Sequence, residues 1–218
     1  MSLEILISGG RGDLAGAMQK EFAVLGDNVR APGRQEMDVR DEASVDAYFA
    51  PLGRLDVLVA NAGVVRDATL FNLTDEDYNA VIDTNLRGVF LCVRAALRLM
   101  LKQRSGHLIL IGSRSARNGP RGQAAYAAAK AGLMAFAQTV AKEYGARDIR
   151  CNVVLPGFLP TKFTSKMTPE RVEAVRAEHA LGRFNTVENA ARFVASLARL
   201  DHVSGQVFTL DSRIDSWT

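Results

Sequence analysis

Short, nearly continuous apolar segments alternate along this chain with longer segments of helical periodicity. Apolar segments of this kind are typical of strands that are covered on both faces of a sheet. We expect strands at Leu3–Ser8, Leu55–Ala60, His107–Gly112, Arg150–Leu155 and Gln206–Leu210. We expect helices at Asp13–Leu25, Asp75–Lys102, Gln123–Tyr144 and Val187–Leu200. This order predicts one α/β domain over residues 1–218, with three αβα layers and a doubly wound parallel sheet that binds ligands at the carboxyl ends of its strands.

One part of the alternation is shortened. Between the strand-like segments Asn28–Ala31 and Met37–Val39 lie only the residues Pro32–Glu36. A crossover that contains a helix needs about 10–12 residues. We therefore expect no helix there, and a third strand that is short, if it forms, and is reached by a plain loop.

The composition argues against several classes of protein. No apolar stretch approaches the roughly 20 residues that span a bilayer, and the N-terminus has no basic segment of the signal-peptide type. Cys92 and Cys151 stand singly in apolar segments, as reduced cysteines of a cytoplasmic protein do. The net charge is only +3, and its Lys and Arg residues are dispersed. We expect no membrane, no nucleic acid and no metal site, and we assign the basic excess to a pocket for a phosphorylated cofactor.

The segment Ser8–Gly16 (SGGRGDLAG) joins the first predicted strand to the first predicted helix. Small residues there let the backbone approach a pyrophosphate, and the start of the helix offers N–H groups and partial positive charge. In this position the segment indicates a Rossmann-like dinucleotide site. The cofactor-binding residues predicted in it are Ser8, Gly9, Arg11, Gly12, Asp13 and Leu14.

Tyr126 and Lys130 stand four residues apart in the alanine-rich segment AAYAAAKAG. On a helix this spacing places both side chains on one face. A nearby ammonium group favours phenolate, so we expect Lys130 to lower the pKa of Tyr126. A tyrosine of this kind donates a proton to a carbonyl oxygen as hydride arrives, or removes one in the reverse direction. Taken alone, the spacing also fits a solvent-facing lysine beside a packed tyrosine.

Two more polar residues favour a catalytic site. Ser113 follows the strand His107–Gly112, where a loop would present its hydroxyl at the active edge of the sheet beside Tyr126. Asn85 lies in an apolar stripe of the long helix, where it would hold a water molecule that connects Lys130 to solvent. An asparagine bonded only to local backbone is the alternative. We predict Asn85, Ser113, Tyr126 and Lys130 as the catalytic set.

Over nearly the whole chain these motifs resemble the short-chain dehydrogenase/reductase family, and most closely its 3-oxoacyl-acyl-carrier-protein reductase group. The residues that carry the resemblance, besides the catalytic set, are Asn61-Ala62-Gly63, Asp38-Val39 and the segment Pro156–Thr161 with Leu181–Phe184. The resemblance implies that Asp38 and Val39 border the adenine, that Asn61, Ala62 and Gly63 border the adenosine side, and that Pro156, Gly157 and Thr161 hold the nicotinamide. It also implies that Lys130 holds the nicotinamide ribose and that two or four copies assemble through the long helices.

The chain departs from that group in its glycine spacing (Gly9, Gly12, Ala15), in its shortened region before Asp38 and in Asp211-Ser212-Arg213, where the family carries Asp-Gly-Gly. These departures affect the adenosine side and subunit packing, and they leave the catalytic residues in place.

No carboxylate stands at the end of the second predicted strand, where it would bond the ribose 2′-hydroxyl of NAD. Arg34 and Arg11 instead reach toward the position of a 2′-phosphate, which guanidinium groups suit. We therefore favour NADP(H) as cofactor, while Glu36 keeps NAD(H) open.

The sequence predicts an oxidoreductase that interconverts a carbonyl and a secondary alcohol on a small molecule or an acyl thioester, with reduction of a 3-oxoacyl thioester as one candidate. Residues 158–181 are expected to form a substrate lid, either as a solvated helix pair or as a basic rim with Lys162, Lys166, Arg171 and Arg176. A nucleotide-binding sensor or scaffold without turnover remains an alternative. A sugar-nucleotide-modifying enzyme is the other, although the residues after Thr161 are too few for its substrate domain.

Overall fold

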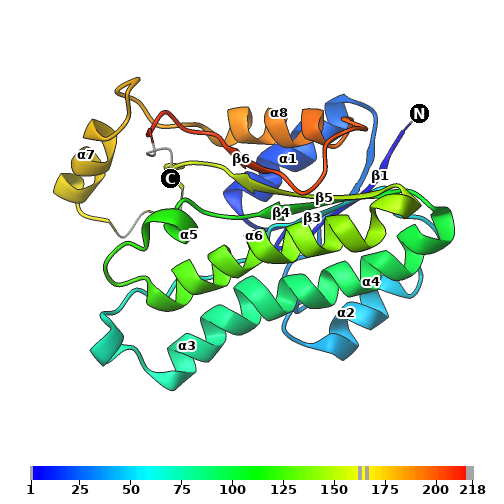
Figure 1. Cartoon of the computed structure of the whole chain (residues 1–218), viewed down its shortest axis with the longest axis horizontal. Coiled ribbons are helices and arrows are strands. Elements are labelled where there is room, and N and C mark those ends of the chain that lie inside the picture. Colours follow the sequence, from blue (N-terminus) through cyan, green and yellow to red (C-terminus); the bar gives the residue numbers. More distant parts are fainter. Residues whose placement is uncertain (1, 162–163, 165–166, 215–218) are drawn as a thin grey trace.

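A parallel β-sheet forms the centre of the computed structural model, which describes residues 2–161, 164 and 167–214 (Figure 1). Within these residues the strands are β1 (Glu4–Ile7), β2 (Asn28–Arg30), β3 (Val57–Ala60), β4 (Gly106–Ile111), β5 (Ile149–Leu155) and β6 (Val207–Thr209). They pair in the order β2-β1-β3-β4-β5-β6, and every pair is parallel. The predicted doubly wound α/β fold is confirmed, and the strand order reverses at β1 and β3, where such folds bind ligands.

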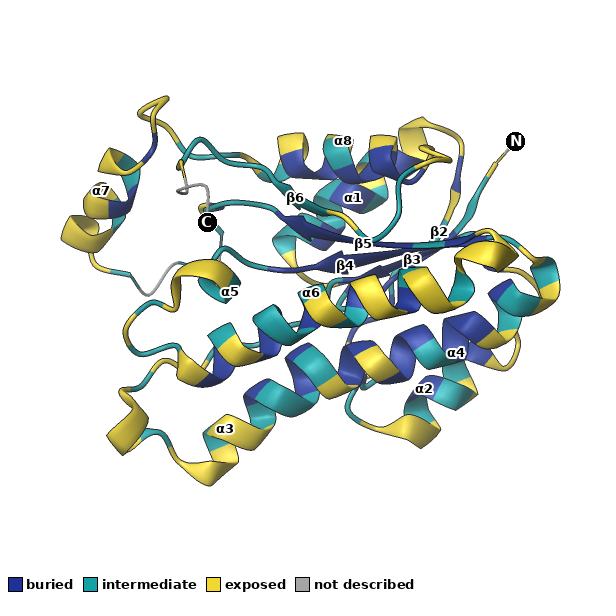
Figure 2. Cartoon of the chain, in the orientation of Figure 1, coloured by how far each residue is buried: buried dark blue, intermediate teal, exposed yellow. Residues whose placement is uncertain are grey.

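Helices cover both faces of this sheet (Figure 1). One layer consists of α1 (Asp13–Val24) and α8 (Val187–Leu197), and the other of α2 (Glu42–Phe49), α4 (Gly88–Gln103) and α6 (Ala124–Tyr144). Neighbouring strand residues point to opposite faces, so Ile5 packs toward α1 and α8 whereas Leu6 packs toward α4 and α6. The central strands are buried on both sides (Figure 2), which explains their unbroken apolar sequences.

The long helix that the sequence predicts over Asp75–Lys102 has an interruption. It consists of α3 (Asp75–Ile82), a single π-helical turn η2 (Asp83–Arg87) and α4. Thr74 caps the start of α3 by accepting a hydrogen bond from the backbone N–H of Asp77. Such π turns are frequent at functional sites, and this one contains Asn85.

Several short elements lie outside the three layers. They are the 3₁₀ turns η1 (Leu70–Asn72) and η3 (Gly145–Arg147), and the helices α5 (Ser115–Asn118) and α7 (Pro169–Ala177). Both helices lie beyond the carboxyl ends of the strands (Figure 1). α7 begins with the capping residue Thr168 and with proline at its first position, which favours the start of a helix there. It falls in the segment predicted as a lid, of which Lys162 and Lys166 lie outside the described residues.

No strand forms at Met37–Val39 in the part of the chain that the structure describes, so β2 is the edge of the sheet. The segment folds instead into a turn in which the carbonyl oxygen of Gly33 accepts hydrogen bonds from the N–H groups of Glu36 and Met37. The Glu36 carboxylate closes this turn by accepting from the N–H of Gly33 at 2.7 Å. The prediction that no helix fits at Pro32–Glu36 is confirmed, and α2 follows the turn instead.

None of the helices in residues 2–161 and 167–214 is long and apolar enough to cross a membrane.

Candidate active site

A cavity of about 830 Å³ opens at the carboxyl ends of the strands. Most of the site residues predicted from the sequence form its wall, namely Gly9, Arg11, Gly12, Asp13, Leu14, Arg34, Asp38, Val39, Asn61, Ala62, Gly63, Ser113, Tyr126, Lys130, Pro156, Gly157 and Thr161. Ser8 and Asn85 are buried and do not reach the wall, so they act on it only through neighbouring residues.

The glycine turn between β1 and α1 is packed too closely for side chains. Gly9 has a φ of +70°, and a Cβ atom there would lie 2.8 Å from the Cα of Ala62. A Cβ atom on Gly10 would lie 1.9 Å from the carbonyl oxygen of Ala31. Gly12 is the N-cap residue of α1 and lines the cavity, and it provides no side-chain hydrogen bond to the first turn of the helix.

Ser8 connects the glycine turn to the segment after β3. Its hydroxyl oxygen accepts hydrogen bonds from the N–H groups of Asn61 at 3.0 Å and Ala62 at 3.1 Å. The Asn61 side chain donates in return to the carbonyl oxygen of Ser8 at 3.1 Å. These bonds join the loop after β1 to the loop after β3, at the point where the strand order reverses.

At the adenosine end, Asp38 binds two arginines. Arg40 donates to both carboxylate oxygens, at 3.0 and 2.7 Å, and Arg34 lies 3.2 Å from one of them. The hydrogen-bonded Arg40 guanidinium holds the pKa of the Asp38 carboxyl well below its usual range. The more exposed Arg11 lies 3.6 Å from Glu36. Both arginines assigned to a 2′-phosphate therefore have carboxylate partners in this structure, and both line the cavity.

Tyr126 and Lys130 are both buried on the face of α6 that turns toward the sheet. The Lys130 Nζ lies 5.7 Å from the centre of the Tyr126 ring and donates a hydrogen bond to the carbonyl oxygen of Ile111, at the end of β4, over 2.7 Å. Ser113 follows β4 and is hydrogen-bonded to Tyr126. The three predicted residues thus meet at one point of the cavity wall.

The pKa values in this cluster differ from the sequence-based expectation. Burial raises the pKa of Tyr126 to about 12, which outweighs the lowering by the Ser113 hydrogen bond. Burial also lowers the pKa of Lys130 to about 8. The expected lowering of the Tyr126 pKa is therefore wrong for this structure, because burial of the phenol outweighs the interactions that favour phenolate. At neutral pH Tyr126 is a phenol, the form that can donate a proton.

Asn85 is fully buried in the π turn, and its side chain bonds to backbone. Its Nδ2 donates to the carbonyl oxygens of Val64 and Val81, both at 2.8 Å, and its Oδ1 accepts from the N–H of Val64 at 3.3 Å. The same oxygen would lie 2.8 Å from a Cβ atom on Gly63. The Asn85 side chain therefore bonds to the distant Val64 backbone as well as to local backbone, and it holds the segment beside Lys130.

We expect Asn85→Ala to lower the free energy of unfolding by about 1–3 kcal/mol, because it leaves the buried carbonyl group of Val81 and the partly buried backbone groups of Val64 without these partners. Asn79→Ala on the exposed face of α3 is the matched control, with an expected change within about 0.5 kcal/mol. Urea unfolding of the two variants measures the difference, and equal stabilities would show that the Asn85 bonds contribute nothing.

The opposite end of the cavity is formed by the segment after β5. Gly157 has a φ of +83°, and a Cβ atom there would lie 2.7 Å from the Cβ of Asp211. Pro156 is held by its carbonyl oxygen, which accepts a hydrogen bond from the Asn185 side chain at 2.9 Å. Thr161 donates its N–H to the Thr164 hydroxyl at 3.1 Å. This wall brings the C-terminal Asp211 segment next to the predicted nicotinamide residues.

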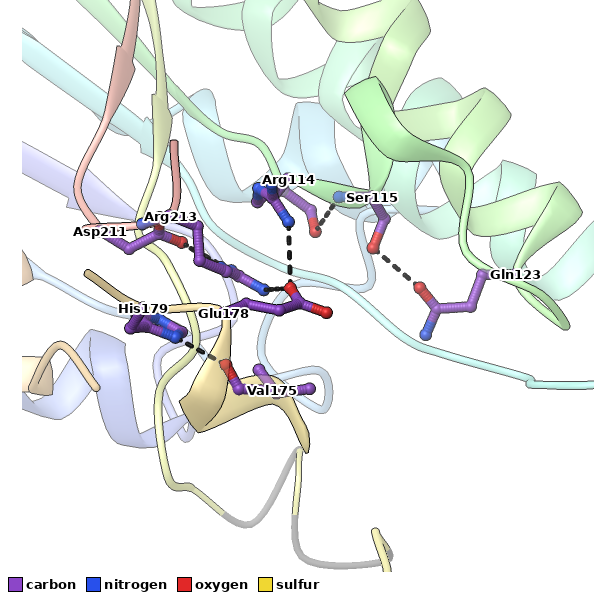
Figure 3. Close-up of polar contacts among 9 residues, drawn as sticks. Arg114, Ser115, Gln123, Val175, Glu178, His179, Asp211 and Arg213 are labelled. Atoms are coloured by element: carbon purple, nitrogen blue, oxygen red, sulfur yellow. Dashed lines mark hydrogen bonds and ion pairs between the residues drawn. The ribbon is translucent and has the colours of Figure 1, made fainter. Parts of the chain in front are cut away.

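Sequence reasoning missed two polar groups at the cavity. In the first, Gln123 accepts from the Ser115 hydroxyl at 2.8 Å and donates to Asp67 at 3.2 Å. In the second, Glu178 at the end of α7 lies between Arg114 and Arg213 (Figure 3). No local sequence pattern predicts either group, because the residues of each group are far apart along the chain.

The wall fits a nicotinamide dinucleotide. One end offers a glycine turn and a helix start whose N-cap residue is glycine, which suit a pyrophosphate, and the cavity continues from there to Tyr126 and Thr161. The described residues contain no group of three or more His, Cys, Asp or Glu side chains that could hold a metal ion.

Known proteins resemble this chain in sequence and structure. The family model described as enoyl-(acyl carrier protein) reductase matches residues 12–212. The 3-oxoacyl-(acyl-carrier-protein) reductase of Synechocystis sp. is 41% identical over 176 residues, which cover 81% of this chain and 70% of that protein. The FabG protein of the same description from Escherichia coli is 40% identical over 179 residues, which cover 80% of this chain and 73% of that protein. The crystal structure of gox2181 superposes with a TM-score of 0.88 at 27% identity and covers 97% of this chain and 95% of that one.

Proposed function

The chain belongs to the short-chain dehydrogenase/reductase family, and we propose that Tyr126 is its general acid and NADP(H) its cofactor. As a member of this family it is an oxidoreductase that acts on carbonyl groups and secondary alcohols with a nicotinamide cofactor. The observation that carries the proposal is the meeting of Ser113, Tyr126 and Lys130 at the wall of the dinucleotide-sized cavity. A sensor or scaffold has no need of a buried lysine beside a buried phenol. Since the matched relatives are named 3-oxoacyl reductases, a 3-oxoacyl thioester is the first substrate to test.

In this proposal each side chain of the cluster has a separate part in carbonyl reduction. Ser113 orients the carbonyl oxygen toward Tyr126, and Tyr126 transfers its phenolic proton to that oxygen. The bound cofactor supplies the hydride for the carbonyl carbon. Lys130 stabilises the phenolate that remains, because its ammonium group lies beside the ring. Asn85 positions the Val64 backbone next to Lys130.

The cavity walls described above bind the separate parts of the cofactor in this proposal. The N–H groups at the start of α1 receive the pyrophosphate, and Asp38, Val39 and Asn61-Ala62-Gly63 border the adenosine. Pro156, Gly157 and Thr161 hold the nicotinamide. Residues 158–181, with α7, form the lid of the substrate end. Assembly as a homodimer or homotetramer stays a prediction.

NADP(H) rather than NAD(H) is proposed because Arg34 and Arg11 line the cavity on exposed side chains. Asp38 retains Arg40 when Arg34 turns away, so Arg34 can move to a 2′-phosphate without leaving that carboxylate unpaired.

We expect kcat/KM to be higher with NADPH than with NADH, and Arg34→Ala or Arg11→Ala to reduce this preference about tenfold each, because each loses hydrogen bonds to a charged group. Arg30→Ala is the control, since Arg30 is exposed but lies outside the cavity wall. Steady-state kinetics with both cofactors measure the ratio. A preference for NADH in the unmodified protein would overturn the arginine assignment.

The reaction itself is tested by incubating the protein with a panel of carbonyl compounds and alcohols, 3-oxoacyl thioesters included, together with NADPH, NADH and their oxidised forms. The proposal predicts reduction of carbonyl compounds in the presence of NADPH. Cofactor binding without turnover of any member of the panel would favour the sensor or scaffold.

A further inference from the structure

Two arginines converge on one carboxylate at the substrate end of the cavity (Figure 3). The Oε2 of Glu178 lies 3.4 Å from Nη1 of Arg114 and 3.8 Å from Nη1 of Arg213. All three residues line the cavity that contains Tyr126. Arg114 directly follows Ser113, which is bonded to Tyr126, so the cluster lies close to the reacting groups.

The arginine side chains are built into the wall. Only 14% of the Arg114 side chain and 10% of the Arg213 side chain are exposed. Asp211 fixes Arg213, because its fully buried carboxylate accepts from Nε at 3.0 Å and from Nη2, and it also accepts the backbone N–H of Arg213 at 3.0 Å. This leaves Nη1 of Arg213 directed toward Glu178. A buried guanidinium group needs a carboxylate partner, and Glu178 is the partner that the two arginines share on the side of the cavity.

Glu178 is held less firmly than the arginines. Its side chain is 54% exposed, and it lies at the C-terminal end of the short helix α7. Its distances to the arginines exceed the roughly 2.7–2.9 Å of charge-assisted hydrogen bonds. A carboxylate that enters from the cavity can approach both guanidinium groups more closely, while Glu178 turns to solvent.

The surrounding charges favour an anion as well. Arg121 and Arg171 line the same cavity. Among the described residues of its substrate end, the carboxylates are Asp67 and Glu178. We propose that Arg114 and Arg213 form a subsite for a carboxylate of the substrate, and that Glu178 occupies this subsite until substrate binds. This inference rests on the proposed carbonyl reduction, and it adds a substrate class to test beside the 3-oxoacyl thioester: carbonyl compounds whose carboxylate lies a few bonds from the reacting carbon.

The test compares keto acids with their uncharged counterparts. Pyruvate, acetoacetate and levulinate are each assayed beside the corresponding methyl ester with NADPH. We expect at least one acid to be reduced with a higher kcat/KM than its ester. Arg114→Met and Arg213→Met should each lower kcat/KM for that acid about tenfold or more, with little change for the ester, because a hydrogen bond to a charged group is lost. Glu178→Gln should lower KM for the acid alone, because it removes the competing charge.

Two controls keep the result interpretable. Arg192→Met removes an exposed arginine of α8 that does not line the cavity, and it should change the acid-to-ester ratio less than about twofold. Because Arg213→Met leaves the buried Asp211 without its partner, it is also made together with Asp211→Asn, and unfolding temperatures confirm that the variants fold. The subsite would be overturned if the esters were reduced with the same kcat/KM as the acids. It would also be overturned if the arginine variants lowered kcat/KM equally for acids and esters.

A binding measurement separates this inference from the proposed function. Butyrate has a carboxylate and no carbonyl, so it cannot be turned over. Should butyrate raise the unfolding temperature of the unmodified protein but not of Arg114→Met, while no carbonyl is reduced, the subsite would stand and the proposed function would fail. Reduction of esters without a preference for acids and without an effect of butyrate would overturn the subsite and leave the proposed function standing.

Discussion

Replacing Lys130 with methionine is expected to remove carbonyl reduction and at the same time to stabilise the folded protein. Lys130 is buried, and its pKa falls from 10.5 to about 8. This corresponds to about 3 kcal/mol of unfavourable free energy for the charged form in the folded state. Loss of the hydrogen bond to Ile111 offsets about 1 kcal/mol, so we expect a net gain of about 2 kcal/mol at neutral pH. Activity should fall at least about a hundredfold, since the partner of the Tyr126 phenolate is lost.

The gain in stability of Lys130→Met over the unmodified protein should decrease as pH rises above about 8. Below about pH 8 Lys130 carries its proton in both the folded and the unfolded state, and the full cost of burying the charge is present. Between about pH 8 and 10.5 the folded state binds fewer protons than the unfolded state, so the unmodified protein gains stability with rising pH. Urea unfolding across this range should therefore show the advantage of Lys130→Met shrinking.

Lys142→Met supplies the matched control, because Lys142 is exposed on the same helix. It should change the free energy of unfolding by less than about 0.5 kcal/mol and leave activity unchanged. A Lys130→Met protein that is less stable than the unmodified protein at neutral pH, or one that keeps its activity, would contradict the account of Lys130.

Tyr126→Phe should lower kcat for carbonyl reduction by about a hundred- to ten-thousandfold while the cofactor still binds. The substitution removes only the hydroxyl group that donates the proton, and the ring stays packed in the cavity wall. Because burial raises the pKa of Tyr126 to about 12, the tyrosine remains protonated in ordinary buffers. Reduction should then need no acidic buffer, and oxidation of the alcohol should become faster as pH rises.

Tyr144→Phe near the end of α6 is the matched control and should have no effect on kcat. The measurements are kcat from cofactor consumption and the dissociation constant of NADPH from fluorescence titration. An unchanged kcat for Tyr126→Phe would refute its role as general acid.

Much of the sheet and its helices is predictable because the local pattern decides them. The uninterrupted apolar residues of β3 and β4 fit a strand buried on both faces, and the alanines of α6 fit a helix packed close to the sheet. Once these elements are placed, Ser113 and Tyr126 must meet at the same end of the sheet. The catalytic cluster thus follows from strand order and helix spacing.

Other features depend on contacts between distant residues. The π turn at Asp83–Arg87 interrupts a segment that reads as continuous helix, and Asn85 within it bonds to the backbone of the distant Val64. The pKa of Tyr126 is raised mainly by burial, which depends on how the whole fold packs around the ring. The meeting of Arg114, Glu178 and Arg213 likewise requires the fold, because nothing in their local sequence links them.

The central claim, hydride transfer to a carbonyl carbon at the Tyr126 site, is tested most directly with NADPH that carries deuterium at the transferable position. We expect a secondary alcohol with deuterium on the former carbonyl carbon from the unmodified protein, and almost none from Tyr126→Phe in the same time. Mass spectrometry and NMR of the product locate the label. Deuterium on another carbon, as in reduction of a carbon–carbon double bond, or an alcohol without deuterium would contradict the account.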